Sequence, residues 1–81
     1  MTVRVRLFAN LREAAGTAEC EVETGSAGDV GRLLDLLCAD YPMLMPHRNY
    51  LRVAVNRVYA RPETLLHEGD EVALIPPTSG G

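Results

Sequence analysis

The last six residues carry the feature of this sequence that most directly points to chemistry. They read Pro76-Pro77-Thr78-Ser79-Gly80-Gly81, and no side chain from Val72 onward is charged. The prolines favour an extended exit, and the glycines lack the side chains that would block a narrow channel. Six extended residues reach about 20 Å, far enough to deliver a terminal carboxylate into another protein's buried site. The alternative is a frayed chain end, for which small residues are also typical.

The other reactive residue types are scarce, and they comprise Cys20, Cys38, His47 and His67. Cys38 lies beside an apolar stripe at helical spacing, and Cys20 shares a strand face with Val22. We therefore expect both thiols to be core residues rather than nucleophiles. His47 and His67 lie in predicted connections with no matching set of ligands nearby, so we expect surface histidines and no metal site.

Length and composition restrict the class of protein. The chain has 81 residues, 47% hydrophobic and 23% charged, which predicts one small folded domain rather than a disordered or fibrous chain. Eight arginines and no lysine stand against eleven acids, and the net charge of −3 has the wrong sign for a nucleic-acid partner. Without lysine, the chain lacks the usual acceptor for isopeptide linkage to another copy of itself.

Three features bear on the compartment. Two cysteines are too few for a disulfide scaffold. No apolar run approaches the roughly eighteen residues of a membrane span. Arg4 and Arg6 place charge where a signal peptide needs an apolar stretch. We therefore expect a cytoplasmic protein without a membrane partner.

Two strands are predicted at the start of the chain. Apolar residues alternate with arginines over residues 2–8, at the two-residue period of a half-buried strand. A second alternating run carries Glu19, Glu21 and Glu23 on its outer face. Residues 10–16 break the alternation and end in glycine, which predicts a turn joining the two strands as a hairpin. We interpret the acidic stripe as a solvated edge that discourages strand addition rather than as a docking site.

A helix and three strands are predicted in the rest of the chain. Ser26 is the expected helix cap, Asp29 lies three positions later, and apolar residues then recur at helical spacing until Pro42 ends the helix. The strands are residues 51–55, a short run at 58–60 after an Asn-Arg turn, and residues 72–75. The last run is almost wholly apolar, which is typical of a central strand covered on both faces.

This order, ββαβββ, predicts the architecture. If the most apolar strand is central, it lies beside the first strand and runs parallel to it, because the connection crosses the sheet. That is the β-grasp arrangement of the α+β class, with about five strands packed on one main helix. We expect a single domain over residues 1–75 and an extended tail over residues 76–81. A four-stranded sheet with a displaced last strand is the topological alternative.

Phe8 is the candidate docking residue outside the tail. Strand alternation places it on the face opposite the core residues of the first strand, and it places Ile75 on the same face of the last strand. If the two strands are neighbours, Phe8 and Ile75 form an exposed apolar patch at the root of the tail. The alternative is that Phe8 folds under the turn that follows it.

Three stretches of sequence carry a family resemblance. They are Val-Arg-Leu-Phe-Ala-Asn-Leu-Arg-Glu at residues 5–13, Gly-Asp-Glu-Val at residues 69–72 and Ile-Pro-Pro-Thr-Ser-Gly-Gly at residues 75–81. Together with the β-grasp pattern, they resemble the small subunit of molybdopterin synthase, a ubiquitin-like sulfur carrier, from one end of the chain to the other. Members usually carry an aliphatic residue at the position of Thr78, a departure that leaves the diglycine intact.

The resemblance implies a mechanism at Gly81. Its carboxylate would be adenylated by an ATP-using adenylyltransferase of the ubiquitin-activating type, and a sulfur donor enzyme would supply the sulfur for a thiocarboxylate. The tail would then enter the large subunit, with Gly80 as its slender approach, and donate sulfur to cyclic pyranopterin monophosphate. Catalytic side chains would come from the large subunit, and the carrier itself would bind no cofactor.

The resemblance also implies which residues contact the partners. They are the docking pair Phe8 and Ile75 and the tail residues Pro76, Pro77, Thr78 and Ser79. Two alternatives remain open. One is a sulfur carrier for thiazole synthesis or transfer RNA thiolation, since the diglycine mechanism is common to these pathways. The other is a noncovalent ubiquitin-like binding module whose tail is inert.

Overall fold

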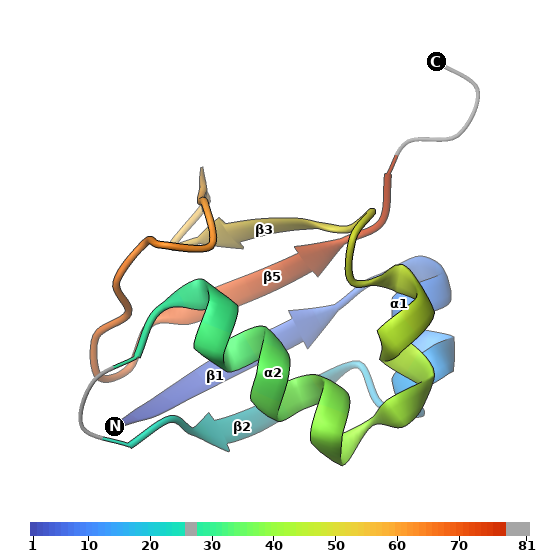
Figure 1. Cartoon of the computed structure of the whole chain (residues 1–81), viewed down its shortest axis with the longest axis horizontal. Coiled ribbons are helices and arrows are strands. Elements are labelled where there is room, and N and C mark those ends of the chain that lie inside the picture. Colours follow the sequence, from blue (N-terminus) through green and yellow to red (C-terminus); the bar gives the residue numbers. More distant parts are fainter. Residues whose placement is uncertain (26–27, 78–81) are drawn as a thin grey trace.

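The computed structural model describes residues 1–25 and 28–77 of the chain (Figure 1). In chain order, the elements are strand β1 (Thr2–Leu7), helix α1 (Ala9–Ala15), strand β2 (Glu19–Glu23), helix α2 (Val30–Asp40), the 3-10 helix η1 (Pro42–His47), and strands β3 (Arg52–Val55), β4 (Val58–Tyr59) and β5 (Glu71–Ile75). The predicted succession of five strands around one main helix is confirmed, and two short helical elements are added to it.

The strands form one mixed sheet in the order β2-β1-β5-β3-β4. β1 pairs antiparallel with β2 and parallel with β5, where Leu7 lies opposite Leu74. β3 pairs antiparallel with both β5 and β4. The central position of the last strand, and its parallel pairing with the first, are therefore confirmed and identify the β-grasp arrangement. The alternative with a displaced last strand is excluded.

The hydrophobic core lies between one face of this sheet and α2 (Figure 1). The buried stripe of α2 consists of Val30, Leu33, Leu34, Leu37 and Cys38. It packs against the buried side chains of the strands, which are Val3, Val5, Leu7, Val22, Val53, Val72 and Leu74. Every second residue of β1 and β5 points into this layer, as the two-residue period requires.

The expectation that the last strand is covered on both faces is wrong. Val72 and Leu74 are fully buried, but Glu71, Ala73 and Ile75 are only half-buried on the opposite face. The continuous apolar sequence of this strand therefore does not correspond to burial of both its faces. Ala73 and Ile75 belong to a sheet face that no helix within residues 1–25 and 28–77 covers, hereafter the open face.

The expectation of a turn over residues 10–16 is also wrong, because Ala9–Ala15 form helix α1. Leu11 is its one fully buried side chain, and Gly16 ends it in the left-handed conformation with φ 78°. The signal was present in the sequence. Alanine, leucine, arginine and glutamate all favour helices, and Gly16 follows directly. The segment η1, expected as a plain connection, similarly starts with Pro42 at its first position and buries Leu44.

The cap of α2 differs from the expected one. Ser26 lies outside the described residues, and Asp29 is the N-cap, with its side chain accepting a hydrogen bond of 2.8 Å from the Arg32 N–H. Two further N–H groups of the first turn, those of Val30 and Gly31, donate to the backbone carbonyls of Thr64 and Pro62. A long-range loop therefore completes this helix end, which local sequence spacing cannot show.

The predicted tight turn between β3 and β4 is confirmed. Asn56 and Arg57 have φ values of 50° and 72°, the left-handed pair required by a two-residue hairpin turn. The Asn56 amide donates to the Asp70 carboxylate at 2.9 Å and accepts from the Glu71 N–H at 3.0 Å. These bonds fix the hairpin to the start of β5.

Candidate functional site

The tail leaves the sheet from its central strand. β5 ends at Ile75, and the chain continues through Pro76, which is half-buried, to the exposed Pro77. The predicted partner-contact residues Thr78 and Ser79 and the predicted reactive residues Gly80 and Gly81 lie outside the described residues. The structure therefore shows what surrounds the root of the tail, and Figure 1 shows that α1 lies at this end of the sheet.

Phe8 and Ile75 lie together at this root. Phe8 is 43% exposed, which confirms the prediction that it does not fold under the segment that follows it. It precedes α1 with extended backbone (φ −122°, ψ 152°), one residue beyond the parallel pair Leu7 and Leu74. Ile75 is half-buried at the matching step of β5. Strand alternation was sufficient to place both residues on one face.

Tertiary structure adds two arginines and a tyrosine that the sequence analysis did not single out. Arg6 lies over the Phe8 ring, with its guanidinium carbon 5.8 Å from the ring centre. Arg52 is paired in register with Ile75 and lies over the Tyr59 ring at 5.9 Å. We refer to Arg6, Phe8, Arg52, Tyr59 and Ile75 as the tail-root patch. The alternation of the strands was the available signal for these residues, but the neighbours of β5 had to be known first.

The acidic stripe lies on the outer strand of the sheet, as predicted. Glu19, Glu21 and Glu23 are exposed on β2, at the edge opposite β4. Glu19 forms an exposed ion pair with Arg4 at 3.4 Å, and Glu23 accepts a hydrogen bond of 2.8 Å from the Thr2 hydroxyl. These contacts support the interpretation as a charged edge that resists strand addition.

The cysteines lie on the core side of the sheet and helix, as predicted. Cys38 is buried, Cys20 is half-buried, and burial raises the pKa of both thiols. His67 is exposed, with its Nδ1 atom 3.8 Å from the Asp70 carboxylate, and His47 ends η1. Over residues 1–25 and 28–77, no three histidine, cysteine or acidic side chains gather in a way that could hold a metal ion.

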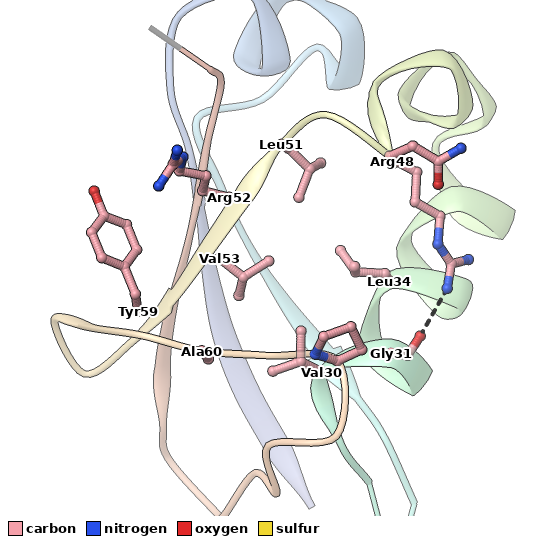
Figure 2. A pocket seen from close by; sticks show the side chains of 11 residues that line it. Val30, Gly31, Leu34, Arg48, Leu51, Arg52, Val53, Tyr59 and Ala60 are labelled. Atoms are coloured by element: carbon pink, nitrogen blue, oxygen red, sulfur yellow. Dashed lines mark hydrogen bonds between the residues drawn. The ribbon is translucent and has the colours of Figure 1, made fainter.

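A groove of about 500 Å³ lies between α2 and β3. Figure 2 shows Val30 and Leu34 of α2, Val53 of β3 and the preceding Leu51 directed into it. On its α2 side, the Arg48 guanidinium pairs with Asp35 and donates to the Gly31 carbonyl at 3.4 Å. This cation is therefore satisfied within the chain. Figure 2 places Arg52 and Tyr59 on the other side of β3, away from α2.

Within the part of the chain that the structure describes, no helix has the length and apolar character needed to cross a membrane.

The sheet order, the single main helix and the exit of the chain from the central strand define a ubiquitin-like β-grasp protein. The chain belongs to the ThiS family, which it matches over residues 5–81. It is similar to the molybdopterin synthase sulfur carrier subunit of Mycobacterium tuberculosis, with 44% identity over 80 residues that cover 98% of this chain and 96% of that protein. It is also similar to the crystal structure of SAMP1 from Haloferax volcanii, with 32% identity, a TM-score of 0.89 and complete coverage of both chains.

A third similarity concerns a protein solved together with its partner. The complex of subunits 1 and 2 of the molybdopterin-converting factor from Helicobacter pylori contains a chain that this protein matches over its whole length, with 24% identity and a TM-score of 0.72. At this identity, the likeness shows the shared fold alone.

Proposed function

We propose that this chain is the sulfur carrier subunit of a molybdopterin synthase. The observation that carries the proposal is the exit of the tail. The central strand β5 ends beside the exposed Phe8 and continues directly into the uncharged segment that finishes on two glycines. A rigid strand positions the root of the tail, the tail-root patch binds the partner, and the terminal residues reach into the partner's site. The relatives' name, molybdopterin synthase sulfur carrier subunit, supports this assignment.

The proposed reaction occurs at the Gly81 carboxylate. A carboxylate is a poor electrophile, so it first attacks the α-phosphorus of ATP and displaces pyrophosphate, forming an acyl-adenylate. Hydrosulfide supplied by the sulfur donor then attacks the acyl carbon and expels AMP, which leaves the thiocarboxylate and releases a proton. The carrier supplies the reacting terminus, and Gly80 gives that terminus the narrow cross-section of a chain without side chains. The activating enzyme, not the carrier, binds ATP.

Three partners follow from this proposal. The first is an adenylyltransferase of the ubiquitin-activating type, the second is a sulfur donor enzyme, and the third is the large subunit, where sulfur passes to cyclic pyranopterin monophosphate. The neighbour from Helicobacter pylori is solved as a complex of two subunits, which supports a pairing of this kind. We place the carrier in the cytoplasm, because its two unpaired cysteines suit a reducing compartment.

Intact-mass measurement tests the proposal. The chain is incubated with the adenylyltransferase, ATP and a sulfur source, and its mass should rise by the difference between one sulfur and one oxygen atom. A matched reaction without ATP should leave the mass unchanged. An unchanged mass in the complete reaction would support the noncovalent module instead.

A binding measurement separates the pathways. The carrier should bind the large subunit of molybdopterin synthase, with sulfur transferred to the pyranopterin substrate. Binding to a thiazole-forming or transfer-RNA-thiolating enzyme, with none to the large subunit, would favour the alternative carrier.

A further inference from the structure

The tail-root patch combines apolar side chains with two exposed guanidinium groups. In the register of the sheet, Arg6 lies opposite Ala73 of β5, and Arg52 lies opposite Ile75. Because β5 separates β1 from β3 and the paired residues Ala73 and Ile75 are two positions apart, the backbone positions of the two arginines are about 12 Å apart, one on each side of the strand that leads to the tail. Any protein that covers Ile75 and Phe8 must therefore meet both cations.

Each guanidinium is held in place by an aromatic ring. Arg6 lies over Phe8 and Arg52 over Tyr59, in the range of cation–π attraction. These contacts restrict two long side chains that would otherwise be mobile, so less conformational freedom is lost when a partner binds them. The rings thus position the cations on the docking surface.

Neither guanidinium is strongly neutralised within the described part of the chain. Arg52 forms no ion pair with a carboxylate there, and the Arg6 contact with Glu71 is 3.9 Å long between side chains that are about half exposed. Exposed pairs of this kind contribute little. Arg48, by contrast, is fixed by Asp35 and the Gly31 carbonyl.

The charge of the chain is also distributed unevenly between the two edges of the sheet. From residue 41 to residue 62 there is no acid, although four of the eight arginines lie there, in a chain whose net charge is −3. The acidic strand β2 lies at the other edge of the sheet. Burying uncompensated guanidinium groups in an apolar interface would be costly, so a stable complex requires carboxylates opposite them.

We propose that the protein surface that receives the tail carries acidic side chains placed to pair with Arg6 and Arg52, around an apolar recess for Phe8 and Ile75. This inference rests on the proposed function and adds the chemistry of the partner's surface. The arginines select partners, because a neutral or basic surface of the same shape would leave two buried cations unpaired. Arg52 carries the larger share, since Arg6 already has Glu71 within reach.

Calorimetric titration of the large subunit with the carrier tests the proposal. Arg52→Glu should weaken binding by about tenfold or more at low salt, and Arg6→Glu should weaken it less. Arg32→Glu is the matched control, because it makes the same charge change on the exposed surface of α2 and should alter the affinity by no more than about twofold. Added salt should weaken wild-type binding and should narrow the difference between wild type and Arg52→Glu.

A charge exchange gives the decisive readout. Each acidic residue on the large subunit's contact surface is changed to arginine and tested against the Arg52→Glu carrier. Recovery of affinity by one of them supports the pairing, because a merely structural role of Arg52 would not produce it. If wild type binds but Arg52→Glu binds equally well, the inference is overturned and the proposed function stands. If wild type does not bind the large subunit, both are overturned.

Discussion

Leu74 and Ile75 are adjacent residues of β5, but they belong to opposite faces of the sheet. Leu74 is fully buried in the hydrophobic core, and Val72 belongs to the same layer. Ile75 lies on the open face, half-buried between the positions of Phe8 and Arg52. We therefore expect one face of this strand to contribute to stability and the other to association. Hydrophobicity alone does not distinguish the two roles, because both side chains are aliphatic and similar in size.

The largest expected effect comes from changing the end of the tail, which should affect sulfur transfer and leave both faces of β5 unaltered. Deleting Gly81, or appending residues after it, should abolish sulfur transfer, because the reacting group is the terminal carboxylate. The melting temperature should stay unchanged, since neither face of β5 is altered. Mass spectrometry for the thiocarboxylate and a thermal melt measure the two quantities. Sulfur transfer by a carrier with a C-terminal extension would contradict the proposed reaction.

Gly80→Val makes a milder change in the same segment. Its side chain would crowd a narrow channel in the partner, so activation should fall far more than stability does. The rate of thiocarboxylate formation is the measurement, and Gly16→Val is an unsuitable control because its φ of 78° would add backbone strain. Glu63→Val is the better control, since it introduces the same side chain at an exposed position outside the tail. Normal thiocarboxylate formation by Gly80→Val would show that the passage is wide.

Substitutions on the two faces of β5 test the comparison directly, because one should affect stability and the other binding. Leu74→Ala should lower the free energy of unfolding by about 2–5 kcal/mol, the usual cost of truncating a fully buried leucine. Ile75→Arg and Phe8→Arg should each weaken binding to the large subunit by about thirtyfold, from the loss of about 2 kcal/mol of hydrophobic burial and the cost of desolvating the new charge.

Loss of affinity and loss of stability should not occur together in the two arginine variants. Denaturant unfolding should be little changed by Ile75→Arg and Phe8→Arg, because Phe8 is 43% exposed and Ile75 is only half-buried in the free carrier. Unchanged affinity, or a large loss of stability in both arginine variants, would place these residues in the core and refute the assignment of the faces.

A smaller effect is expected at the end of the sheet away from the tail. Asn56→Ala removes the bonds to Asp70 and Glu71 and leaves a residue with a Cβ atom at a φ of 50°. We expect about 1–3 kcal/mol less stability, with no change in affinity for the large subunit. Asn56→Gly relieves the backbone strain but not the lost bonds, so it should lie between wild type and Asn56→Ala in denaturant unfolding. Equal stability of all three proteins would show that the Asn56 hydrogen bonds to Asp70 and Glu71 do not stabilise the fold.

The smallest expected effect concerns the rate at which the two cysteines on the core side of the sheet are alkylated. Burial raises the pKa of the Cys20 and Cys38 thiols, so less thiolate is present at neutral pH than in the unfolded chain. Iodoacetamide should therefore alkylate the folded carrier more slowly than the denatured one, and Cys38 should react more slowly than Cys20 because it is more deeply buried. Peptide mapping at successive times measures both rates. Rapid labelling of native Cys38 would show that the layer under α2 opens readily.

Local periodicity was sufficient for much of this fold. Residues with a two-residue alternation became β1 and β2, the apolar stripe of α2 followed the helical period, and the two-residue hairpin turn fell at Asn56 and Arg57 as predicted. These features depend on contacts between residues close in sequence, where side-chain type fixes the geometry. The two terminal glycines were equally evident from the sequence, although they lie outside the described part of the chain.

Tertiary structure decided the features that depend on which strands are neighbours. The apolar run in β5 did not predict that one face of the strand lacks a covering helix, because aliphatic residues occur both in a core and on a partly exposed surface. The first turn of α2 is completed by the carbonyls of Pro62 and Thr64, more than thirty residues away. Arg6 and Arg52 are 46 positions apart in the sequence and flank the same strand only because the sheet order places β1 and β3 on either side of β5. The sequence by itself determined the local elements and the terminus, and long-range strand pairing determined which side chains surround the root of the tail.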